Sequence, residues 1–151
     1  MAELEFSIDI AAQADRVFVF FIPQRMPYWY GAEMDAHYEV EGGRAEFRVG
    51  DKVHIRARLS RREVSITTVV TRYERGRLLE WQFHDAHGVR GMQRWVLEPT
   101  ATGTIVKMSD HFKLPGRFGW LFEWLITRRA AALRGKHWLA RLKQLSEGNR
   151  K

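Results

Sequence analysis

The chain has 151 residues, 45% of them hydrophobic and 28% charged, which is typical of a globular protein and excludes an intrinsically disordered one. It has no cysteine, so disulfides and thiolate metal ligands are excluded, and it carries none of the common nucleotide-binding or hydrolase motifs. Because its most apolar windows are too short to span a bilayer and its first residues do not resemble a signal peptide, we expect one cytoplasmic domain over residues 1–151.

The net charge of +7 is concentrated at the C-terminal end. Residues 1–116 contain sixteen basic and sixteen acidic residues, whereas residues 117–151 contain nine basic and two acidic ones. Basic residues near the end of a helix complement its dipole, which favours a solvated helix face. The alternative is a surface that binds an anionic membrane, and nucleic acid is a less favoured partner. The sequence carries no signal for an oligomeric state.

The N-terminal third predicts one strand and two short helices. Residues 3–10 alternate between polar and apolar side chains, which is typical of a half-buried strand. Residues 11–22 predict a helix with one apolar side, ended by Pro23. Residues 26–30 predict a second helical turn or an aromatic loop, closed by Gly31.

The rest of the chain predicts strands followed by one helix. A period of two marks six segments, 33–40, 53–59, 64–73, 79–84, 89–97 and 104–112. Because short turns join them, the strands must be antiparallel. Residues 118–145 predict a long amphipathic helix, with an apolar stripe at Leu121, Leu125, Ala132, Leu139 and Leu142. We therefore expect an α+β fold in which a curved antiparallel sheet of about seven strands, in the order β-α-α-β6-α, surrounds the C-terminal helix, the one element large enough to cover it.

Six short strings occur in a characteristic order: 49–56 (VGDKVHIR), 77–81 (RLLEW), 94–99 (RWVLEP), 103–104 (GT), 114–116 (LPG) and 141–143 (RLK). Together they resemble the START-related helix-grip superfamily (SRPBCC), especially its polyketide cyclase/dehydrase-like and coenzyme-Q-binding-like members. The resemblance covers nearly the whole chain. It implies a cavity between sheet and C-terminal helix that holds a lipid, sterol, quinone or polyketide. Some members catalyse cyclisation or dehydration, but no catalytic motif is common to all.

Inward-facing strand positions are the candidate ligand contacts. Most are apolar and a few are polar, which is the usual composition of a ligand pocket. They are Tyr38, Ile55, Ala57, Ile66, Thr68, Trp81, Phe83, Gln93, Trp95 and Met108. The alternative is that the aromatic side chains simply fill the core of a small domain.

Asp110 is the candidate catalytic residue, because the alternation of its strand places it on the inner face. A buried carboxylate must be paired, hydrogen-bonded or protonated. Arg72, on the inner phase of its strand, and Arg128, near the apolar stripe of the helix, are the candidate partners, and Arg128 is also a candidate ligand contact. Asp110 would then anchor a ligand hydroxyl, act as a general base, or form a structural ion pair.

Two further features allow more than one interpretation. His84, Asp85 and His87 could bind zinc, but a hairpin turn without a further ligand makes a metal site improbable, and we expect none. Gly135 lies within the long helix, where glycine costs about 1 kcal/mol relative to alanine. Either a ligand or loop approaches it, or the helix packs closely on the sheet there.

From the sequence we expect a carrier or sensor that binds a small hydrophobic molecule such as a quinone, lipid or polyketide, without a cofactor. The alternative is a cofactor-independent cyclase or dehydratase in which Asp110 acts with Gln93 or Tyr38.

Overall fold

A computed structural model describes residues 2–31, 35–43, 45–59, 62–85, 90–113 and 120–148. In chain order the elements are β1 (Ala2–Ile10), α1 (Ala14–Phe18), η1 (Met26–Tyr28), β2 (His37–Val40), β3 (Lys52–Leu59), β4 (Arg62–Glu74), β5 (Leu78–Asp85), β6 (Arg90–Pro99), β7 (Thr104–Lys113) and α2 (Trp120–Glu147). This order confirms the predicted one. The expected start of the second strand at 33 and the string 114–116 lie outside the described residues.

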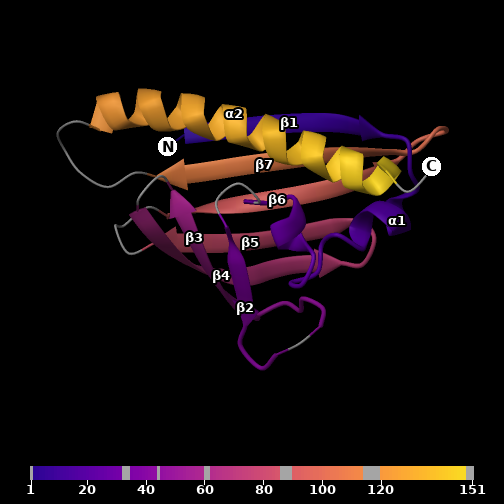
Figure 1. Cartoon of the computed structure of the whole chain (residues 1–151), viewed down its shortest axis with the longest axis horizontal. Coiled ribbons are helices and arrows are strands. Elements are labelled where there is room, and N and C mark those ends of the chain that lie inside the picture. Colours follow the sequence, from indigo (N-terminus) through magenta and orange to yellow (C-terminus); the bar gives the residue numbers. More distant parts are fainter. Residues whose placement is uncertain are drawn as a thin grey trace.

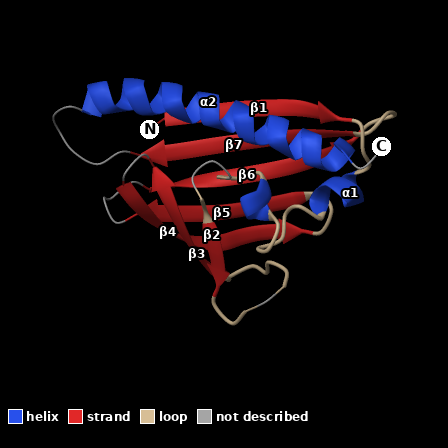
Figure 2. Ribbon diagram, viewed as in Figure 1, coloured by secondary structure: helices blue, strands red, loops and turns tan. Residues whose placement is uncertain are grey.

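The described strands form one seven-stranded antiparallel sheet in the order β1-β7-β6-β5-β4-β3-β2. The sheet is curved, and α1, η1 and α2 lie on one side of it (Figures 1 and 2). Helix α2 runs beside β1 and β7, packs against β1, and meets α1 near its C-terminal end. No helix among the described residues is long and apolar enough to cross a membrane.

Alternation along the strands separates the covered inner face from the solvated outer face. In β1, Leu4 and Ile10 are buried, whereas Glu3 and Asp9 are exposed. This is the pattern of an antiparallel sheet that is covered on one side. The inner face is therefore the place where the described part of the chain builds its core.

A register shift in β4 overturns one prediction. The pairing with β5 skips a residue between Val70 and Arg72, so that Val70 faces Trp81 on the inner side while Arg72 lies opposite Glu80 on the outer side. Such a bulge reverses the phase of a strand. Arg72 is exposed, so the prediction that it points inward as a partner of Asp110 was wrong.

Aromatic side chains fill the inner face at the end near α1. Trp29, Trp81 and Trp95 are completely buried. The ring centres of Trp81 and Trp95 are 5.0 Å apart, and those of Phe21 and Trp29 are also 5.0 Å apart. The segment containing α1 and η1 thus covers part of the sheet, and the prediction that only the C-terminal helix could do so was wrong.

Close packing fixes the C-terminal half of α2 on β1. A Cβ atom added at Gly135 would lie 2.6 Å from the Phe6 ring, so the glycine allows the helix to approach the strand. Of the predicted apolar stripe, Leu139 and Leu142 are buried. The side chains of Leu121, Leu125 and Ala132 lie outside the described residues. Of the two interpretations of Gly135, close helix–sheet packing is the one that the structure supports.

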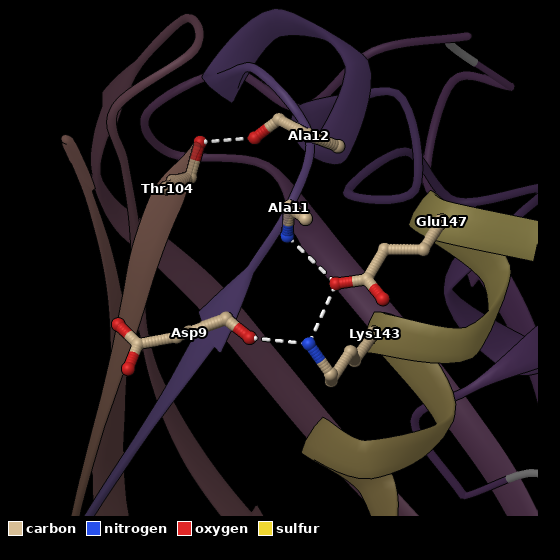
Figure 3. Close-up of polar contacts among 6 residues, drawn as sticks. All are labelled: Asp9, Ala11, Ala12, Thr104, Lys143 and Glu147. Atoms are coloured by element: carbon tan, nitrogen blue, oxygen red, sulfur yellow. Dashed lines mark hydrogen bonds and ion pairs between the residues drawn. The ribbon is translucent and has the colours of Figure 1, made fainter. Parts of the chain in front are cut away.

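Polar contacts hold the end of α2 to the end of β1 (Figure 3). The Ala11 N–H donates to Glu147 Oε2 at 2.6 Å. The Lys143 ammonium donates to the Asp9 carbonyl at 2.8 Å and to Glu147 Oε2 at 2.6 Å. The basic charge of Lys143 is therefore used within the fold.

Candidate functional site

A polar pair lies in the middle of a buried row that crosses the inner face. The strand registers align Val70, Trp81, Gln93, Asp110 and Leu4 on β4, β5, β6, β7 and β1. All five side chains are buried. The row lies next to the one that contains Trp95, at the edge of the aromatic core.

The Gln93 side chain connects the other polar groups of this row through hydrogen bonds. Its Oε1 accepts from the Trp81 indole N–H at 2.7 Å, and its Nε2 donates to the Tyr30 hydroxyl. It also donates to the Asp110 carboxylate. These contacts engage both ends of the amide, while its oxygen keeps a second lone pair.

Asp110 is only 8% exposed, and its Oδ1 has no hydrogen-bond partner in the described part of the chain. Burial raises the pKa of Asp110 to about 6, although the hydrogen bond from Gln93 and the nearby His111 partly oppose the shift. The carboxyl group is therefore mostly ionised at neutral pH, yet titrates within reach of it. A group in this range can act as a hydrogen-bond acceptor or as a general base.

Tyr30 is a member of the cluster that the sequence did not predict. It follows η1 and is buried, which raises the pKa of its phenol well above the ordinary value, and the charge of Asp110 raises it further. The phenol therefore stays protonated. Its ring lies 4.6 Å from that of Trp138 on α2, and its carbonyl accepts the Tyr38 hydroxyl at 3.0 Å. The aromatic run 26–30 was visible in the sequence, but not that it folds back onto β6 and β7.

The other predicted contacts fall into two groups. Ile55, Ala57, Thr68, Trp81, Trp95 and Met108 are buried, whereas Tyr38, Ile66 and Phe83 are half-buried. The Thr68 hydroxyl donates to the Val53 carbonyl at 3.3 Å. Trp95 Nε1 has no partner among the described residues. The structure places these residues on the inner face, and their role in ligand binding stays a prediction.

Part of each of two predicted sites lies outside the described residues. Arg128 belongs to α2, but its side chain lies outside them. His87, the second histidine of the weighed zinc motif, also lies outside them. Within the described part of the chain, no three His, Asp or Glu side chains gather as metal ligands would.

Comparison with known proteins gives a family and a fold. A family model described as polyketide cyclase / dehydrase and lipid transport matches residues 1–147. No curated protein matches the sequence. A Chromobacterium violaceum crystal structure aligns over 97% of this chain and 99% of its own, with a TM-score of 0.72 and 16% identity. An Arthrobacter aurescens solution structure aligns over 99% and 88%, with a TM-score of 0.75 and 16% identity.

A third similar structure comes from a biosynthetic locus. DynU16, from the dynemicin locus, aligns with 97% of this chain but only 48% of its own length, with a TM-score of 0.69 and 19% identity. At such identities the similarity shows a shared fold alone.

Proposed function

This chain belongs to the polyketide cyclase/dehydrase and lipid transport family, and we propose that it binds a small hydrophobic ligand, such as a quinone, lipid or polyketide, as a carrier or sensor. The observation that carries the proposal is the buried Asp110 carboxylate, whose Oδ1 is unpartnered among the described residues. Buried polar atoms in native proteins nearly always have partners, so Oδ1 is a position at which a donor from outside the chain, such as a group of a ligand, would be stabilised.

The surroundings suit a ligand that is apolar with one polar end. Asp110 anchors the polar end, with Gln93 and Tyr30 fixing its carboxylate. The inner-face positions Tyr38, Ile66 and Phe83 are half-buried, and we assign them to the apolar part. The remaining proposed contacts are Ile55, Ala57, Thr68, Trp81, Trp95, Met108 and Arg128.

Native mass spectrometry of the purified chain tests this proposal. We expect a non-covalent adduct that disappears on denaturation and that organic extraction recovers as an apolar molecule. Protein stripped of the adduct should gain thermal stability when a long-chain alcohol is added, because a ligand that binds the native state alone stabilises it. No adduct, together with no stabilisation by any apolar probe, would refute the proposal.

A second candidate function is dehydration of a β-hydroxy ketone. The favouring observation is that three polar groups converge, with a carboxylate whose pKa of about 6 suits a general base. Asp110 would take the proton from the carbon beside the carbonyl as the C=C bond forms. It would return that proton to the departing hydroxyl, so that one water leaves and the carboxylate is restored.

Turnover of 4-hydroxy-4-phenylbutan-2-one to its enone, followed by absorbance, tests the second candidate. Asp110→Asn should lower the rate at least about 100-fold, the usual contribution of a general base. Asp51→Asn is the matched control, because Asp51 is also 8% exposed but its Oδ2 accepts the Arg48 N–H at 2.8 Å. Binding of the ketone without any enone would exclude this candidate and leave the carrier.

A further inference from the structure

The orientation of the Gln93 amide is fixed by its neighbours. An indole N–H can only donate, so the atom that faces Trp81 Nε1 at 2.7 Å must be the amide oxygen. The amide nitrogen then faces the opposite way, where it donates to Tyr30 and to Asp110. The amide is therefore held at both ends, and the buried carboxylate oxygen that has no partner among the described residues is Oδ1 of Asp110.

The Oδ1 atom of Asp110 is buried and has no partner in the described part of the chain, although the Gln93 amide lies beside the carboxylate and lowers its pKa. The carboxylate therefore presents an unmatched acceptor at Oδ1. An ionised carboxylate oxygen can only accept a hydrogen bond, and an acceptor this deeply buried costs free energy until a donor reaches it.

We propose that the ligand carries a hydroxyl group at its polar end, that this hydroxyl donates to Asp110 Oδ1, and that the site rejects analogues that can only accept a hydrogen bond. The inference rests on the proposed binding function and specifies the ligand chemistry of the same site: a lipid or polyketide with a hydroxyl group fits, whereas an oxidised quinone, which can only accept, does not. A carbonyl or ether oxygen would place a second acceptor against the carboxylate, with no donor between them. Gln93 and Tyr30 act as positioning residues, because they hold Asp110 in the orientation that makes this choice.

Two probes that differ in one hydrogen-bond donor test the inference. 2-Naphthol can donate, whereas 2-methoxynaphthalene can only accept, and the two share their ring system. Isothermal titration calorimetry on the full chain at pH 8 should show at least tenfold tighter binding of 2-naphthol, since burying an unmatched acceptor costs more than one factor of ten. Equal affinities for the wild-type protein would overturn the inference while leaving apolar binding intact. If neither probe nor naphthalene binds, the proposed function fails, and the inference with it.

Substitution at Asp110 gives an independent reading. In Asp110→Asn the Gln93 N–H should hold the amide oxygen, which places the amide N–H2 where Oδ1 lies. The site then offers a donor, so the preference for 2-naphthol should fall below about threefold or reverse. Asp51→Asn, an equally buried acid outside the cluster, should keep the tenfold preference. A tenfold preference that survives in Asp110→Asn overturns the inference, and the wild-type comparison decides alone if that variant does not fold.

Discussion

Replacing Asp110 with asparagine should stabilise the protein at neutral and alkaline pH, although the side chain is buried and hydrogen-bonded. The pKa of Asp110 is about 6, against 3.8 for an unperturbed aspartate. A difference of about two pKa units corresponds to about 3 kcal/mol lost whenever the buried group is ionised. Asparagine removes the charge but keeps the shape and an acceptor for Gln93, so we expect a gain of about 1–3 kcal/mol.

The direction of the pKa shift of Asp110 fixes how the stability difference between the two proteins changes with pH. Because the carboxyl group has a higher pKa in the folded than in the unfolded protein, the folded state binds the extra proton at intermediate pH. The stabilisation of the folded protein by this extra proton is fully present below the pKa that Asp110 has in the unfolded protein. It is lost as the pH rises through the folded-state pKa of about 6. The advantage of Asp110→Asn should therefore be largest above pH 7 and disappear by about pH 4.

Urea denaturation of both proteins at several pH values measures the effect, with the difference in unfolding free energy taken at each pH. That subtraction removes the titration of groups that are common to both proteins and do not interact with residue 110. Asp51→Asn should show no gain in stability at pH 8, since its carboxylate already has a donor in the Arg48 N–H, which asparagine also accepts. A variant at Asp110 that is less stable than wild type at pH 8, or a difference that does not change with pH, would show that this carboxylate serves the fold.

Three further changes probe the scaffold by the same denaturation assay. Gly135→Ala should lower the unfolding free energy by about 1–2 kcal/mol because its Cβ meets Phe6, whereas a gain of about 1 kcal/mol would show that the ring moves aside. Glu147→Ala should cost about 1–2 kcal/mol and Glu147→Gln less, because glutamine keeps an acceptor for the Ala11 N–H; equal losses would show that charge dominates. Burial opposes ionisation of Glu80, but hydrogen bonds from Thr71 and Arg94 hold its pKa below the ordinary value. Glu80→Gln should therefore lose about 1–2 kcal/mol at pH 7, and the loss should vanish as the pH falls through that pKa; a gain at pH 7 would contradict this.

The alternation of side chains predicted the strands well because the sheet is covered on one face. Within each strand the apolar positions then identify the inner side, as Leu4 and Ile10 do in β1. The alternation no longer identifies the inner side where a strand is irregular. The bulge after Val70 leaves no clear mark in a run rich in β-branched residues, so the inward placement of Arg72 could not have been corrected from sequence.

The candidate site was predicted strand by strand but not as a cluster. Asp110 and Gln93 were both assigned to the inner face, yet periodicity does not say which residues of neighbouring strands face each other. That depends on register, which here aligns the two across β6 and β7. Tyr30 was missed for a related reason, since it reaches Gln93 across 63 positions of sequence from a segment without a regular period.

Two equally buried acids, Asp110 in β7 and Asp51 just before β3, separate a structural role from a functional one. Asp51 and Asp110 are each 8% exposed. The carboxylate of Asp51 closes a turn by accepting the Arg48 N–H, which gives its burial a purpose within the fold. Asp110 closes no turn, its Oδ1 has no partner in the described part of the chain, and its ionisation costs about 3 kcal/mol. A native protein with a stability of only about 5–15 kcal/mol is expected to tolerate such a cost chiefly at a site of binding or catalysis.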